Sequence, residues 1–182
     1  ENSKEIKESY YFWKHELTAV SSFINKENIK EIICKHGFET NLGILSIDID
    51  GNDYWILKEL KDVAPDIIIC EYNSLLGDKK SLTIKYDKNF YRANNSINKI
   101  NYGASIQAIH KILKDEYILV YGNSFGNNVF YINKKYHGLI KEKTIPECYK
   151  EISFNELTHL KEVPNEFKKK TKLIDLSKFE DV

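Results

Sequence analysis

Short apolar runs alternate along this chain with segments whose apolar residues recur at helical spacing. The apolar runs predict strands at residues 17–24, from Ile44 onward, at 67–70, at 117–121 and at 129–133. Helical spacing predicts helices at residues 26–37, from Asp53 onward and at 104–116. Gly37 is expected to end the first of these helices, because glycine tolerates the left-handed conformation common there. Alternating strands and helices predict an α/β fold.

The last two predicted strands are joined by a turn rich in glycine and asparagine, which predicts an antiparallel hairpin. The preceding strands are separated by helices, which is typical of parallel strands. We therefore expect a mostly parallel sheet with one reversed strand at its edge.

Two long segments lack a clear pattern. Residues 74–102 are rich in Asn, Lys, Asp and Tyr with little periodicity, which predicts a binding loop or a lid. Residues 139–182 are rich in Lys and Glu and contain one stretch, FNELTHLKEV, that is expected to be helical. We expect residues 1–138 to form the domain and residues 139–182 to form a charged C-terminal extension.

Composition excludes several classes of protein. The 182 residues carry 27 basic and 27 acidic side chains, so the chain lacks the basic excess of a nucleic-acid binder. No apolar run approaches the ~20 residues of a membrane span, and no signal peptide is visible. Three cysteines without close pairs indicate reduced thiols and no structural zinc. These features predict a cytoplasmic protein that does not bind membranes and acts on a small molecule. They are compatible with a homo-oligomer.

Three carboxylates follow the strand that begins at Ile44. Asp48, Asp50 and Asp53 lie within the stretch ILSIDIDGNDYWILKEL, between the strand and the helix that follows. Ligands of open α/β sheets bind at the carboxyl ends of the strands, so these acids are candidate functional residues. In a purely structural interpretation Asp53 caps the helix, which leaves Asp48 and Asp50 without a role.

The run Asp-x-Asp-Gly has two further interpretations. Phosphatases of the haloacid dehalogenase type use such a pair as nucleophile and acid/base with Mg²⁺, but the acidic metal pair expected later in the chain is absent. Glycosyltransferases that bind nucleotide sugars use Asp-x-Asp to hold Mn²⁺, although that motif normally opens into a loop rather than a helix. Both remain alternatives.

Four stretches, LSIDIDGNDYWILKEL, PDIIICEYN, YGAS and GNSFGNNVFYI, together resemble a bacterial family related to the FkbM-type methyltransferases. The resemblance covers residues 17–133 and implies the second half of the Rossmann-like class I methyltransferase fold, without its N-terminal strands. It further implies an enzyme that uses S-adenosylmethionine to methylate an oxygen of a small molecule or of a glycan precursor for bacterial surface polysaccharide, such as capsule. The non-enzymatic alternative is a degenerate methyltransferase-like binding module.

The resemblance assigns cofactor contacts to four residues. Ser22 and Phe23 match positions that contact adenine, Glu1 would bind the ribose hydroxyls, and Asp48 belongs to the same binding edge. The glycine-rich turn that holds the methionine part of the cofactor in this fold is not found before Leu17. This departure leaves open whether the chain holds the cofactor.

The resemblance also suggests two roles for the acids. Asp50 and Glu71, at neighbouring strand ends, would remove a proton from the nucleophile of the acceptor. Alternatively, Asp48, Asp50 and Glu71 would bind Mg²⁺ or Mn²⁺, since hard cations prefer oxygen ligands. The sequence does not show whether these carboxylates act as a base or bind a metal ion.

Residues around the long loop are candidates for binding the acceptor, which we expect to be a small or sugar-linked molecule. Aromatic rings with a hydroxyl group suit a sugar or a nucleotide. Arg92 is the chain's single arginine, and a guanidinium binds a phosphate or carboxylate with two parallel hydrogen bonds. The predicted acceptor-binding residues are Tyr72, Asn73, Tyr86, Arg92 and Tyr102.

Overall fold

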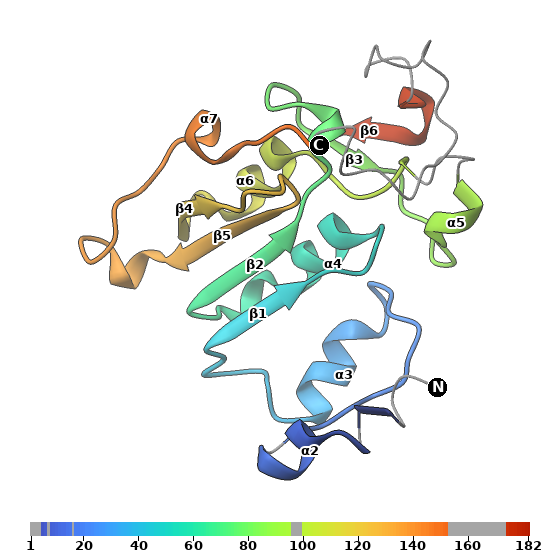
Figure 1. The fold of residues 1–182 in the computed structure, drawn as a ribbon, viewed down its shortest axis with the longest axis vertical. Coiled ribbons are helices and arrows are strands. Elements are labelled where there is room, and N and C mark those ends of the chain that lie inside the picture. Colours follow the sequence, from blue (N-terminus) through green and yellow to red (C-terminus); the bar gives the residue numbers. More distant parts are fainter. Residues whose placement is uncertain (1–4, 7, 16, 96–99, 153–173) are drawn as a thin grey trace.

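The computed structural model describes residues 5–6, 8–15, 17–95, 100–152 and 174–182. Its main sheet has four strands in the order β1-β2-β5-β4 (Figure 1). These strands are β1 (Ile44–Ile47), β2 (Ile67–Glu71), β4 (Tyr117–Gly122) and β5 (Asn128–Asn133). The predicted α/β class and the predicted hairpin are therefore confirmed.

The prediction of a mostly parallel sheet is wrong, because only β1 and β2 pair in parallel. Strand β5 pairs antiparallel with β2 on one side and with β4 on the other. The reversed strand thus lies inside the sheet and β4 forms the edge. The sequence identifies a hairpin, but it does not show which of its two strands pairs with the rest of the sheet.

Helices α4 (Asp53–Leu60) and α6 (Ile106–Leu113) pack against this sheet and against each other. Leu57 of α4, Ile109 of α6 and Ile68 of β2 are fully buried in the shared core. Each such side chain contributes about 1.5–3 kcal/mol when it is removed from water. The apolar faces that predicted the two helices therefore also hold them against the strands.

The strand predicted at residues 17–24 is wrong, because this segment has neither helical nor strand structure. Its residues Leu17, Val20 and Phe23 are exposed. β-branched and aromatic residues favour a strand only where a neighbouring strand and a core are present, and this segment pairs with no strand among the described residues. The helix expected after it is present as α3 (Ile29–Lys35), preceded in the chain by α2 (Tyr10–Lys14).

Gly37 ends α3 as predicted. Its φ of 77° is in the left-handed region, its N–H donates to the carbonyl of Cys34, and the next N–H, of Phe38, donates to Ile33. This pair of hydrogen bonds satisfies carbonyls at the end of the helix.

The described part of residues 74–102 contains more regular structure than the sequence predicts. The segment contains the 3₁₀ turn η2 (Ser74–Leu76), strand β3 (Leu82–Ile84) and helix α5 (Arg92–Asn95). Strand β3 pairs with β6 (Phe179–Asp181) in a second, two-stranded sheet. The two strands share a small apolar core that consists of Leu76, Leu82, Ile84, Phe90, Tyr102, Ile174 and Phe179. A three-residue strand whose partner lies at the other end of the chain leaves no periodic pattern.

Helix α7 (Ile145–Cys148) follows the hairpin and packs on β4. Gly122 and Gly126 allow this close approach, since a Cβ at either position would overlap the backbone of Cys148 or Lys150. The remaining 3₁₀ turns are η1 (Lys61–Val63), η3 (Lys134–Tyr136) and η7 (Leu176–Lys178). The helix predicted at FNELTHLKEV lies outside the described residues, and the domain boundary at residue 138 stays a prediction.

Within the described part of the chain, no helix has both the length and the apolar character needed to cross a membrane.

Candidate functional site

The parallel strands β1 and β2 bring acidic residues together at their carboxyl ends. Ile47 pairs with Cys70, so Asp48 and Glu71 occupy equivalent positions where the two strands end. Asp50 lies two residues after Asp48 in the chain. One carboxylate oxygen from each of Asp48, Asp50 and Glu71 lies within 4.8 Å of the other two. Three of the predicted site residues therefore form one cluster, which we call the acid cluster.

The turn between β1 and α4 is held by Asp53, which is fully buried. Its carboxylate accepts hydrogen bonds from the backbone N–H groups of Ile49 (2.9 Å) and Gly51 (2.8 Å). Between these two residues Asp50 has a φ of 58°, a conformation that aspartate tolerates better than most residues. Asp53 thus fixes the backbone that presents Asp50, and it neither joins the acid cluster nor caps α4, whose N-cap is Asn52.

Glu71 is the least exposed member of the acid cluster, with 6% of its surface accessible. Burial, followed by the nearby charges of Asp53 and Asp48, raises the pKa of its carboxyl to about 8. Burial also raises the pKa of Asp48, with Asp50 adding to the effect. The acid cluster therefore favours an additional positive charge or a retained proton.

The donor set fits a hard divalent cation. Oxygen Oε2 of Glu71 is buried and has no hydrogen-bond partner among the described residues. A buried carboxylate oxygen without a partner is costly, and a cation that is also bound by Asp48 and Asp50 would remove that cost. Mg²⁺ or Mn²⁺, which prefer carboxylate oxygens, would suit this site.

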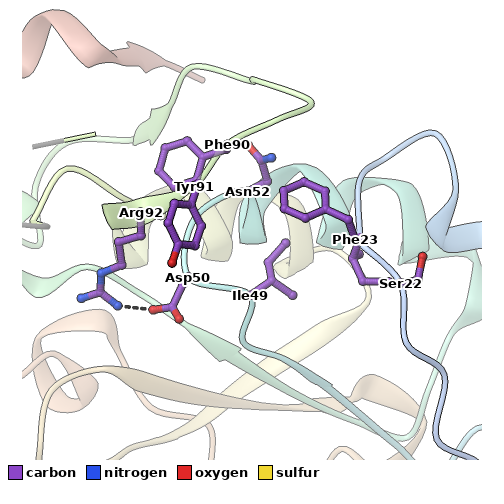
Figure 2. Close-up of a pocket in the computed structure, with 9 residues that line it drawn as sticks. Ser22, Phe23, Ile49, Asp50, Asn52, Phe90, Tyr91 and Arg92 are labelled. Carbon is purple, nitrogen blue, oxygen red and sulfur yellow. Dashed lines mark hydrogen bonds and ion pairs between the residues drawn. The ribbon is translucent and has the colours of Figure 1, made fainter. Parts of the chain in front are cut away.

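A pocket of about 280 Å³ opens beside Asp50 (Figure 2). Ser22 and Phe23 stand on one side, whereas Asp50, Tyr91 and Arg92 stand together on the other. The complete set of lining residues is Ser22, Phe23, Ile24, Ile49, Asp50, Asn52, Phe90, Tyr91 and Arg92. Two residues predicted to bind the cofactor, Ser22 and Phe23, thus share a pocket with a member of the acid cluster.

Arg92 forms an ion pair with Asp50 through Nη1 (Figure 2). Its guanidinium carbon lies 3.6 Å from the centre of the Tyr102 ring. Tyr102 itself is buried beneath it, and burial followed by the charge of Glu71 raises the pKa of its phenol, which stays neutral. Arg92 is therefore held between an aromatic ring and a carboxylate at the edge of the pocket.

The other residues predicted to bind the acceptor are engaged elsewhere. The hydroxyl of Tyr72 donates to the carbonyl of Lys150, and the amide of Asn73 donates to the carbonyls of Ile100 and Tyr102. The hydroxyl of Tyr86 donates to Glu27. These contacts join segments of the fold, and none of these side chains lines the pocket beside Asp50. Glu1, the predicted ribose ligand, lies outside the described residues.

Sequence reasoning missed several residues of the pocket wall. Phe90 lies two residues before Arg92 in a segment without periodicity, so only its proximity to the single arginine could have indicated it. Asn52 is 3% exposed, its Nδ2 donates to the carbonyl of Asp87, and its Oδ1 has no partner among the described residues. In the sequence, the stretch Gly51-Asn52 predicts only a turn, because both residue types are common in turns.

Comparisons with protein-family models, with curated proteins and with solved structures found no match for this chain.

Proposed function

We propose that this protein is a methyltransferase that uses S-adenosylmethionine and methylates an oxygen of a small or sugar-linked acceptor. The observation that carries the proposal is the acid cluster at the carboxyl ends of β1 and β2, beside the pocket that Ser22 and Phe23 line. Open α/β sheets bind their ligands at this edge. That the acceptor belongs to bacterial surface polysaccharide rests on the sequence resemblance alone.

The directions of the strands in the main sheet support the proposal. Strands β1, β2 and β4 run in the same direction and β5 is reversed. The class I methyltransferase sheet that the sequence resembles likewise combines strands of one direction with a reversed strand from a C-terminal hairpin. A shared fold is compatible with many activities, so the acid cluster carries more weight than the sheet.

Methyl transfer requires few functional groups from the protein. In the transfer, the acceptor oxygen attacks the methyl carbon in line, the bond from sulfur to carbon breaks, and the proton of the acceptor hydroxyl passes to a base. Glu71, with a pKa of about 8, is suited to accept this proton near neutral pH. The negative charge of Asp48 and Asp50 favours either the positively charged sulfonium or a divalent cation that orients the acceptor.

The first experiment is calorimetry with S-adenosylhomocysteine, the product of the cofactor, followed by a methyl-transfer assay with radiolabelled cofactor and sugar-linked acceptors. Asp50→Asn and Glu71→Gln should each lower turnover at least tenfold with little change in the affinity for S-adenosylhomocysteine. Loss of activity with EDTA would assign the acid cluster to a metal, whereas activity that survives chelation would assign it to proton transfer.

Two results would contradict the proposal. Micromolar binding of a nucleotide sugar without binding of S-adenosylhomocysteine would favour a glycosyltransferase. Hydrolysis of phosphate esters that depends on Asp48 and Mg²⁺ would favour a phosphatase. If the protein is instead a degenerate binding module, we expect that neither S-adenosylhomocysteine nor a nucleotide sugar binds and that no group is transferred.

A further inference from the structure

We propose that Arg92 recognises the acceptor, and that the acceptor carries a carboxylate or phosphate group that replaces Asp50 as the partner of Arg92. This inference rests on the proposed function and adds the class of acceptor to it.

Arg92 is positioned independently of Asp50. The guanidinium lies 3.6 Å above the centre of the Tyr102 ring, and Tyr102 is 7% exposed within the core that also contains Phe90. An arginine stacked on an aromatic face is attracted electrostatically to the ring. When Asp50 leaves, the ring therefore keeps the guanidinium in place at the edge of the pocket.

The ion pair itself is exchangeable. The side chain of Asp50 is 61% exposed, and that of Arg92 is 27% exposed. Pairs with this much exposure contribute little to stability, because water solvates both partners when they separate. A carboxylate or phosphate that forms two parallel hydrogen bonds with the guanidinium would compete effectively with Asp50.

Within the described lining of the pocket, an anion finds a single cationic partner. Among the described residues that line it, Arg92 is the one basic side chain and Asp50 the one acidic side chain. Apart from its five histidines, every other basic residue of the chain is a lysine, whose ammonium group lacks the planar fork of a guanidinium. The arginine therefore stands at the position where geometric recognition of an anion is possible.

The exchange would link acceptor binding to the acid cluster. An acceptor that occupies Arg92 frees the carboxylate of Asp50, whose oxygens lie near those of Asp48 and Glu71. Asp50 is then more readily available to a cation or to the reacting hydroxyl than it is when paired with Arg92. Asp50 thus acts as an internal competitor of the acceptor anion.

The test uses inorganic phosphate as the probe and nitrogen-15 labelled protein in metal-free buffer at constant ionic strength. Because Arg92 is the single arginine, its Nε–H group gives one arginine side-chain signal that reports binding directly. We expect phosphate to shift this signal in the unaltered protein. Asp50→Asn should raise the phosphate affinity about threefold, since it removes an exposed competitor of modest strength.

Two replacements of the arginine and one matched control complete the series. Arg92→Gln should lower the phosphate affinity at least tenfold, as read from backbone amides around the pocket, and Arg92→Lys should give an intermediate affinity. Lys88→Gln removes a charge from an exposed side chain of the same segment and should leave the affinity unchanged. Circular dichroism and thermal unfolding verify that each variant folds.

Three results would overturn the inference. One is a phosphate response no larger than that to sodium chloride, the second is equal affinity in Arg92→Gln, and the third is weaker rather than tighter binding in Asp50→Asn. None of these measurements involves S-adenosylmethionine. Failure here with intact methyl transfer would therefore reject the anionic acceptor and keep the proposed function.

Discussion

The ring of Phe90 lies directly against Gly51, so that a Cβ added to Gly51 would overlap the ring atoms Cδ1 and Cε1. Gly51 belongs to the turn that presents Asp50, and Phe90 lines the pocket next to Tyr91 and Arg92. The contact therefore joins the acid cluster to the segment that carries Arg92. A hydrogen bond from the N–H of Gly103 to the carbonyl of Gly51 adds a second link to this turn.

Replacement of Gly51 by alanine should displace Phe90. We expect Gly51→Ala to lower the free energy of unfolding by about 1–3 kcal/mol, the usual cost of adding a methyl group to a packed site. Urea denaturation measures this change. Gly43→Ala is the matched control, because a Cβ at Gly43 meets no atom within 4 Å. Equal stability of the two variants would show that the Phe90 ring moves aside without lowering the free energy of unfolding.

Replacement of Asp53 by asparagine should loosen the turn that holds Asp50. The two carboxylate oxygens of Asp53 accept from Ile49 and Gly51, and an amide offers only one acceptor oxygen. We expect a loss of about 1–3 kcal/mol, the cost of leaving a buried polar group unpaired. Urea denaturation at pH 7 tests this expectation. Asp62→Asn, which changes an exposed aspartate, should have little effect, and an equal loss in both variants would contradict the assignment.

The buried carboxyl of Glu71 should make stability fall as the pH rises. Its pKa is raised from 4.5 to about 8, so the folded protein keeps a proton that the unfolded chain releases. The contribution of Glu71 to the free energy of unfolding is complete below pH 4.5 and is lost as the pH rises toward 8, with a slope of at most ~1.4 kcal/mol per pH unit.

The pH range 7–8 separates this effect from that of Asp53, because the pKa of Asp53, which burial also raises, is about 6 and its carboxyl is mostly ionised above pH 7. Glu71→Gln should remove the negative slope in this range, and Glu59→Gln, which changes an exposed residue of α4, should retain it. Urea denaturation at three pH values suffices. A slope that is the same in unaltered protein and in Glu71→Gln would show that the carboxyl has no raised pKa.

The acid cluster should bind one Mn²⁺ ion per chain. Loss of one of three carboxylate ligands in Asp48→Asn should weaken the binding at least tenfold, which corresponds to about 1.4 kcal/mol. The free Mn²⁺ signal in electron paramagnetic resonance measures this affinity without any assay of activity. Asp115→Asn, which lies in the turn after α6, serves as the control. Equal Mn²⁺ affinity in both variants would exclude the acid cluster as the metal site.

Local patterns determined much of this protein. The apolar run from Ile44, the turn at Gly51 and the amphipathic segment from Asp53 predicted β1, the acidic turn and α4, because each depends on neighbouring residues in the chain. The approach of Asp50 to Glu71 could also be predicted, since parallel strands end at the same edge of a sheet.

Only the tertiary structure decided the features that depend on distant partners. Residues 17–24 have the composition of a strand but no neighbouring strand among the described residues, whereas the unpatterned Leu82–Ile84 forms β3 because β6 pairs with it. The same holds for Phe90 in the pocket wall, which comes from a segment without periodicity. A strand pairing or a pocket wall depends on which surfaces meet in space, and periodicity along the chain records only which face of an element is buried.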